Sequence, residues 1–191
     1  AVSVTRSRDV PRGTAGGLYR PLLLISFDLQ TRAFGDRLTG YHAVNVALHV
    51  AVVLALYGFL LTLLRRAAAP PKTARLAALS AGLLFAVHPV HAEVVNSVFN
   101  GSSMYVALSA ILGLWWLFTH LDSRPLKAWL GFGAAYCVGI LFKESALVIP
   151  GIAVALIVIL GPGSLPERLR RFLPVFWLLI PIAVYFYLRQ A

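Results

Sequence analysis

Residues 41–64, YHAVNVALHVAVVLALYGFLLTLL, contain no Asp, Glu, Lys or Arg and decide the fold class of this chain. A helix that crosses a lipid bilayer needs about 20 mostly apolar residues, and this stretch is long enough. Five more stretches without those charged residues follow it, at 76–92, 94–121, 128–142, 145–166 and 172–188. The sequence therefore predicts an all-α, polytopic transmembrane helix bundle with about six crossings, at about 41–64, 76–90, 103–121, 127–142, 145–160 and 172–188.

The composition of the chain is typical of a membrane protein. Of its 191 residues, 59% are hydrophobic and 13% are charged, whereas a soluble domain has about 25% charged residues. The net charge of +10 would suggest nucleic-acid binding in a soluble protein. Here the charges lie between the apolar stretches, as do loop charges that orient membrane helices. We therefore expect the lipid bilayer, and no nucleic acid, as a partner.

The distribution of basic residues predicts which loops face the cytoplasm. The loops at 65–75, 122–127 and 166–171 are rich in Arg and Lys, and two predicted crossings separate each loop from the next. Basic loops of multi-pass proteins are enriched on the cytoplasmic side, so we place all three there. Residues 1–40, the connection at 88–103 and the turn at 143–144 then lie on the opposite side. We expect a multi-pass protein of the bacterial inner membrane or the endoplasmic reticulum.

Residues 1–40 form a predicted external segment ahead of a transmembrane bundle at 41–191. Residues 19–33 are apolar enough for a helix, but Asp28 and Arg32 interrupt them, which favours a helix at the membrane interface. Pro21 suits the first turn of that helix. The chain starts without an apolar signal segment and ends directly after an apolar stretch. We expect it to be a fragment of a longer protein.

Three polar side chains lie in the first predicted crossing, namely His42, Asn45 and His49. Their spacing of three and then four residues places them on one face of a helix. Polar groups within a crossing usually face the interior of the bundle. Our interpretation is structural, with hydrogen bonds from Asn45 and His49 to a neighbouring helix. A functional role for this face is the alternative.

A second polar cluster, His88-Pro89-Val90-His91-Ala92-Glu93, lies at the end of the second predicted crossing. Pro89 breaks the helix because it disfavours helical backbone at His88. Two His and a Glu can hold zinc, but their spacing matches no recognised zinc motif, so we expect no metal cofactor. We predict that His88, His91 and Glu93 bind or orient a substrate, or that they cap a helix.

Arg20, Lys143 and Glu144 complete the polar groups on the predicted non-cytoplasmic side. Lys143 and Glu144 form a charged turn between two apolar stretches, which is either a plain solvated turn or part of a site. Positive side chains bind phosphate, so Arg20 and Lys143, together with the imidazoles at 88 and 91, suit a phosphate-bearing lipid. Polyprenyl-phosphate sugars are natural candidates, with Glu144 orienting a hydroxyl or a loop.

Four segments together resemble a known family. They are Tyr19-Arg20-Pro21-Leu22, residues 40–49 (GYHAVNVALH), residues 84–93 (LFAVHPVHAE) and Lys143-Glu144. The series resembles the membrane part of the transmembrane and tetratricopeptide-repeat O-mannosyltransferases and their bacterial relatives, which are glycosyltransferases of the GT-C class. The resemblance covers about residues 19–160. Its most specific part is the His-Pro-Val-His-Ala-Glu block.

The resemblance implies a function. Enzymes of this class transfer a hexosyl group from a polyprenyl-phosphate donor to a protein hydroxyl outside the cytoplasm. Their catalytic base is an acid in the first external loop, where it would remove the proton of the acceptor. That loop and the tetratricopeptide repeats have no counterpart in this sequence. We therefore expect the base upstream of Ala1 and assign no catalytic residue here.

Two other function classes stay open at this point. A non-enzymatic polytopic subunit of a larger membrane complex would also lack the acidic loop, and other membrane subunits would then be its partners. A transporter ranks last, because the chain has no inverted repeat and no paired charges within a predicted crossing.

Overall fold

The computed structural model describes residues 19–97, 101–161 and 163–190. Within these ranges the regular elements are helices, so the predicted all-α class is confirmed. Residues 1–18 of the predicted external segment lie outside the described part. The elements are α1 (Pro21–Phe34), α2 (Leu38–Arg66), α3 (Pro71–Val87), α4 (Val90–Asn96), α5 (Ser102–His120), α6 (Pro125–Phe142), the 3₁₀-helix η2 (Glu144–Val148), α7 (Ile149–Leu160), α8 (Leu165–Phe172), the 3₁₀-helix η3 (Leu173–Leu178) and α9 (Leu179–Gln190).

Prolines mark where several helices begin and where one pair is bent. Pro21, Pro71 and Pro125 are the first residues of α1, α3 and α6, where a missing backbone N–H breaks no helical hydrogen bond. Pro89 lies between α3 and α4, which are bent by 61° relative to one another. His88 before it is extended, with φ −67° and ψ 127°, as the residue before a proline prefers. The polar residues that follow α3 therefore lie in a turn and a short helix.

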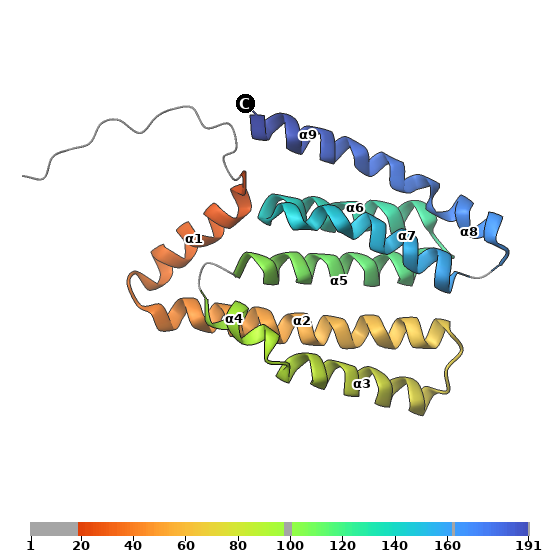
Figure 1. Ribbon diagram of the computed structural model, residues 1–191, viewed down its shortest axis with the longest axis horizontal. Coiled ribbons are helices and arrows are strands. Elements are labelled where there is room, and N and C mark those ends of the chain that lie inside the picture. The colour runs from red at the N-terminus through yellow and green to blue at the C-terminus, as the bar shows by residue number, and fades with distance from the viewer. Residues whose placement is uncertain (1–18, 98–100, 162, 191) are drawn as a thin grey trace, which may run out of the picture.

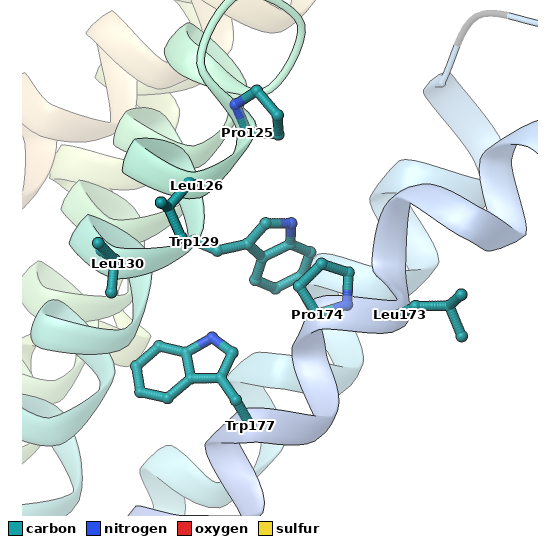
Figure 2. A pocket seen from close by; sticks show the side chains of 7 residues that line it. All are labelled: Pro125, Leu126, Trp129, Leu130, Leu173, Pro174 and Trp177. Carbon is teal, nitrogen blue, oxygen red and sulfur yellow. The ribbon is translucent and has the colours of Figure 1, made fainter.

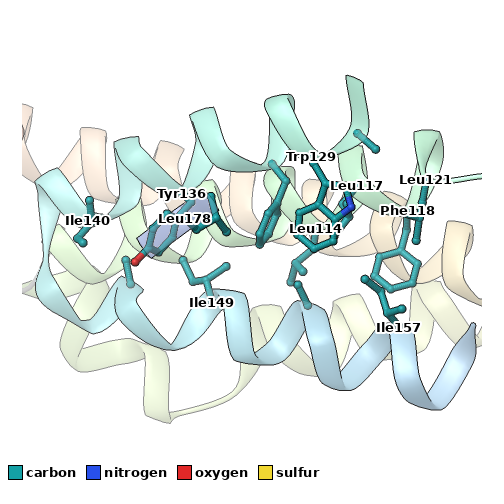
Figure 3. Packing of buried hydrophobic residues seen from close by; sticks show 14 of the residues in the cluster. Leu114, Leu117, Phe118, Leu121, Trp129, Tyr136, Ile140, Ile149, Ile157 and Leu178 are labelled. Atoms are coloured by element: carbon teal, nitrogen blue, oxygen red, sulfur yellow. The ribbon is translucent and has the colours of Figure 1, made fainter. Parts of the chain in front are cut away.

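The long helices lie side by side and alternate in direction (Figure 1). α5 is central, because it contacts both α2 and α6. Figure 3 shows the hydrophobic core, to which α5, α6, η3 and α7 contribute. Its largest fully buried side chains belong mostly to these helices, and they include Leu117, Phe118, Trp129, Phe132, Tyr136, Ile140, Ile157 and Leu178.

Small residues let these helices approach closely. A Cβ atom at Gly139 of α6 would lie 2.6 Å from Oγ of Ser109 in α5 and 3.3 Å from Cβ of Ala146 in η2. Helix pairs in membranes depend on such small residues, since the bilayer adds no hydrophobic driving force between helices. Gly139 therefore fixes how α5, α6 and η2 meet.

Four described helical segments are long and apolar enough to cross a membrane: α2, α5, α6 and the continuous segment Leu165–Gln190. The bent pair α3 and α4 makes a fifth if it is one broken span. The remaining apolar segment, Glu144–Leu160, is shorter, since it consists of the five residues of η2 and the 12 residues of α7. A multi-pass helical membrane protein is thus confirmed, while a sixth crossing stays a prediction.

The bundle has two ends of different character (Figure 1). We call the end that carries α1 and α4 the polar end, and the end that carries the connections α2–α3, α5–α6 and α7–α8 the basic end. At the basic end Asp122 forms ion pairs with Arg66 and with Arg171. These pairs join α2, the α5–α6 connection and α8. The three basic loops of the sequence therefore share one end of the bundle.

Candidate functional site

The polar end holds the residues that the sequence singles out, and it holds them in two groups. The first group lies where α6 ends, η2 begins and the chain enters α1. The second group lies where the end of α3 and the start of α4 meet α2. Among the described residues, the hydrogen bonds, ion pairs and ring contacts join these side chains within each group.

Arg20 and Glu144 form a bidentate ion pair in the first group. Nε of Arg20 donates to Oε2 of Glu144 at 3.1 Å, and Nη2 donates to Oε1 at 2.7 Å. The planar guanidinium suits this two-point geometry, and the side chains are 18% and 34% exposed. The hydrogen bonds from Arg20 hold the pKa of the Glu144 carboxyl below its ordinary value. Glu144 therefore largely neutralises the charge of Arg20 even without a bound phosphate.

Tyr19, next to this pair, connects the same segment to α9. The hydroxyl of Tyr185 donates to the backbone oxygen of Tyr19 at 3.3 Å, and the two rings meet edge to face with centroids 5.9 Å apart. The residues that lead into α1 are thus held both by η2 and by α9. We expect this double attachment to fix the angle at which α1 leaves the bundle.

Lys143 supplies the second cation of the first group. It caps the C-terminus of α6 with extended backbone, φ −163° and ψ 139°, and so turns the chain into η2. Its Nζ donates to Oγ of Ser103, in the first turn of α5, at 3.0 Å. Among the described residues no ion pair joins Lys143 to an acid. A half-buried ammonium with two N–H donors left can donate them to an anionic oxygen.

Two aromatic rings lie beside Lys143. Tyr105 of α5 and Phe142 of α6 stack with their centroids 4.2 Å apart and their planes at 2°. This contact brings the first turns of α5 to the last turn of α6, so it positions Ser103 and Lys143 relative to each other. The geometry of the ammonium group therefore depends on the packing of both helices.

The second group is a cluster of imidazoles around Phe85. The ring centroid of His91 lies 4.1 Å from that of Phe85, 5.5 Å from that of His49 and 6.1 Å from that of His88. Nε2 of His49 is 3.0 Å from the backbone oxygen of Ala86, while its buried Nδ1 has no hydrogen-bond partner within the described ranges. His88 supports the local turn, since its Nδ1 accepts the backbone N–H of Val90 at 3.2 Å.

Asn45 anchors the end of α4 to α2. Only 5% of the residue is exposed, and its Nδ2 donates to the backbone oxygens of Val95 and Ser97, each at 3.1 Å. A Cβ at Gly101 would lie 2.9 Å from Oδ1 of Asn45, so this position requires a glycine. Asn45 therefore holds the end of α4 against α2, with Gly101 close by.

The remaining predicted residues are exposed. His42 lies on the surface of α2, away from the buried Asn45, and Glu93 lies on the surface in the first turn of α4. The spacing of His42, Asn45 and His49 along α2 therefore does not give the three side chains the same environment. Within the described residues, no three His, Cys, Asp or Glu side chains gather as a metal site requires. Our prediction that no metal binds stays a prediction.

The structure brings together partners that the sequence did not connect. Arg20 meets Glu144, and Lys143 meets Ser103, but the described contacts place neither cation with His88 or His91. The described contacts therefore arrange these side chains in two groups, and their joint role in binding a phosphate-bearing lipid stays a prediction. Ser103 and Tyr185 had no signal of their own, because a serine at a helix start and a tyrosine in a spanning helix are ordinary residues there.

Comparisons with known proteins find relatives for part of the chain. No family model and no solved structure matches it. Protein O-mannosyl-transferase TMTC2 of Homo sapiens is 32% identical over 136 residues, which are 69% of this chain and 15% of that protein. Protein O-mannosyl-transferase Tmtc3 of Drosophila melanogaster is 32% identical over 158 residues, 71% of this chain and 17% of that protein. Protein O-mannosyl-transferase TMTC4 of Homo sapiens is 34% identical over 100 residues, 49% of this chain and 14% of that protein. The chain thus spans a small part of the curated relatives that it matches.

Proposed function

By sequence the chain belongs to the TMTC family of protein O-mannosyl-transferases, and on this premise we propose that the protein transfers mannose from a polyprenyl-phosphate donor to a protein hydroxyl on the non-cytoplasmic side of the membrane. The relatives support a sugar transferase that acts on proteins. The donor and the side of the membrane are our inference from the charges at the two ends of the bundle.

One observation carries the proposal, namely the half-buried Lys143 at the polar end. Its ammonium is positioned by Ser103 at 3.0 Å and forms no ion pair with a described acid. When the bond between the sugar and the donor phosphate breaks, negative charge grows on the leaving phosphate. A positive group held in place stabilises this charge in the transition state. We assign this role to Lys143.

Arg20 and Glu144 act differently in this proposal. Because each balances the other's charge, we assign them to positioning: the pair ties the start of α1 to the turn that carries Lys143. His88 and His91 belong to the neighbouring cluster of imidazoles. In this proposal they contact the sugar or the acceptor. We assign none of the described residues to removal of the proton from the acceptor. In enzymes of this class an acidic side chain acts as that general base.

The orientation of the bundle follows from its charges. The basic end carries the loops at 65–75, 122–127 and 166–171, and basic loops are enriched in the cytoplasm. The polar end then faces the other side, where a lipid-linked sugar and an exported protein would meet. Cleavage of the loop at 65–75 by a protease added to the external side of intact membranes would argue against this orientation.

The test uses the full-length protein in membranes, with radiolabelled mannosyl polyprenyl phosphate and an acceptor peptide. We expect Lys143→Ala to lower kcat/KM by about 100-fold, the usual effect of removing one transition-state donor, and Lys143→Arg to retain part of the rate. Lys72→Ala is the matched control, because Lys72 is exposed at the basic end. Its rate should equal that of the wild type.

Two results would contradict the proposal. If Lys143→Ala transferred mannose as fast as Lys72→Ala, the assignment of Lys143 would be wrong. If the wild-type protein transferred no sugar and co-purified with other membrane proteins, the alternative of a non-enzymatic subunit would replace the enzyme.

A further inference from the structure

An apolar groove lies at the basic end, between α6 and the segment where α8 passes into η3. Its volume is about 630 Å³, within the range of about 300–1,000 Å³ that is usual for small-molecule sites. Figure 2 shows its two walls. One wall is formed by Leu126, Trp129 and Leu130 of α6, and the other by Leu173, Pro174 and Trp177 of η3.

One of the side chains that line the groove lies almost wholly beneath its surface. The side chain of Trp129 lines the groove but is almost completely buried, and its indole Nε1 has no hydrogen-bond partner in the described part of the chain. A buried donor without an acceptor is unfavourable. Because this atom is inaccessible from outside, the surface that Trp129 presents to the groove is apolar.

Two arginines adjoin the lining residues of the groove in the chain, one next to each wall. Arg124 directly precedes Pro125 at the start of α6, and Arg170 lies three residues before Leu173. Both are exposed, and among the described residues neither forms an ion pair with an acid. Their neighbour Arg171 is different, since it pairs with Asp122. The chain next to both walls thus carries uncompensated positive charge.

We propose that this groove binds an anionic phospholipid of the leaflet at the basic end. An acyl chain lies between Trp129 and Trp177, and the phosphate is held between Arg124 and Arg170. Basic pockets between membrane helices on the cytoplasmic side are suited to anionic headgroups. The site lies at the opposite end of the bundle from Lys143, so it does not depend on the proposed sugar transfer.

A phospholipid fits the observations better than another protein helix does. The side chains that line the groove are apolar, and Arg124 and Arg170 adjoin the lining residues in the chain, which matches one molecule with hydrocarbon chains and one anionic head. Many large apolar side chains on the outer faces of α2, α3 and α6 are exposed, among them Leu54, Leu83 and Leu130. These faces are where a membrane protein meets lipid, so acyl chains reach the groove directly.

The test measures lipid binding by the full-length protein in phosphatidylcholine nanodiscs that contain a small fraction of spin-labelled phosphatidylglycerol. The double variant Arg124→Gln with Arg170→Gln should bind this probe about 30-fold more weakly, because each basic group near an anionic lipid contributes about fivefold. The control Lys72→Gln with Arg75→Gln removes the same charge from the same end, on α3. It should change binding by less than about twofold, because these residues do not flank the groove.

A second variant tests the groove itself. Leu130→Trp should fill the space between the walls and displace the immobilised acyl chain without a change in charge. Elution as a single species in size-exclusion chromatography checks that each variant is folded. If one variant does not fold, the other still tests the proposal.

Several outcomes would overturn the proposal. Equal loss of binding in the Lys72 and Arg75 control would show attraction by net charge alone. Equal immobilisation of spin-labelled phosphatidylcholine would show that the two arginines do not select an anionic headgroup. Complete competition by inorganic phosphate would indicate an anion site without an acyl chain, and preferential binding of polyprenyl phosphate would identify a different lipid.

Discussion

Arg20 and Glu144 show how a single ion pair sets the chemistry of the polar end. The two residues are 124 positions apart in the chain, yet they share two hydrogen bonds at partial burial. Charge-assisted, bidentate pairs are among the stronger polar contacts in proteins. Because Glu144 occupies the guanidinium of Arg20, Lys143 is the neighbouring cation that stays open to a phosphate. Arg20, which the sequence suggests as a phosphate ligand, thus has a carboxylate partner in the fold, and its role as a ligand stays a prediction.

Replacing Glu144 tests this pair through its pH dependence. The folded-state pKa of Glu144 is lowered by Arg20, so the pair stabilises the protein above the ordinary glutamate pKa and loses this contribution as the pH falls through the lowered value. We expect Glu144→Gln to lower stability by about 1 kcal/mol at neutral pH and to flatten the decline below about pH 4.5. Thermal unfolding of the purified protein in detergent between pH 3 and pH 7 measures both effects.

Asp28→Asn serves as the matched control for that experiment. Asp28 pairs with Arg32 within α1, but both side chains are well exposed, and exposed pairs contribute little. If both substitutions had the same effect on the pH profile, the partly buried pair of Arg20 and Glu144 would have no special role.

At the scale of elements, the site depends on how α5, α6 and η2 meet. Lys143 lies at the end of α6, its partner Ser103 in the first turn of α5, and Glu144 at the start of η2. The small residue Gly139, one helical turn before Lys143, allows this approach. The bend at Pro89 acts in a similar way on the second group, because it turns α4 and His91 toward Phe85 and His49.

A side chain at Gly139 should separate these elements. The Cβ of Gly139→Ala would lie 2.6 Å from Oγ of Ser109, and added atoms in a packed interior usually cost about 1–3 kcal/mol. The matched change is Gly151→Ala in α7, where a Cβ meets nothing within 4 Å and replacement of a helical glycine is favourable by about 0.5–1 kcal/mol. Thermal unfolding should show a lower Tm for the first variant and an equal or higher Tm for the second. The opposite order would contradict the packing at Gly139.

At the scale of the whole molecule, the basic end is organised around Asp122. This acid pairs with Arg66 from α2 and with Arg171 from α8, so it connects α2 with the segment Leu165–Gln190 through the α5–α6 connection. Without it, two arginines would face each other with no acid between them. The basic end also carries the apolar groove, whereas the polar end carries the candidate transferase site. The two ends therefore differ both in charge and in proposed ligand.

Removal of this acid should weaken the bundle in a salt-dependent way. We expect Asp122→Asn to lower the Tm by about 2–4 °C at low salt, which corresponds to about 1 kcal/mol in a protein of this size. The difference should shrink at about 1 M salt because exposed charges are then screened. Asp36→Asn, an exposed acid in the α1–α2 connection, should leave the Tm unchanged. A loss of Tm that did not respond to salt would indicate a cause other than the two ion pairs.

The sequence by itself determined the class of this protein. Charge-free stretches such as 41–64 are long enough to span a bilayer, where backbone groups must be bonded within a helix, so their helical state follows from local sequence. Pro21, Pro71 and Pro125 likewise indicate where helices begin, since their effect on the backbone is local. The ordered motifs from Tyr19 to Glu144 were enough to identify the family.

Only the tertiary structure decided which polar groups meet. The contacts of Arg20 with Glu144, of Lys143 with Ser103 and of His88 with His91 depend on how the helices rotate and approach one another. That arrangement is set by many packing contacts between residues far apart in the chain, such as those at Gly139. The groove at Trp129 has the same origin, because its two walls come from α6 and η3 and neither wall alone shows that a groove exists.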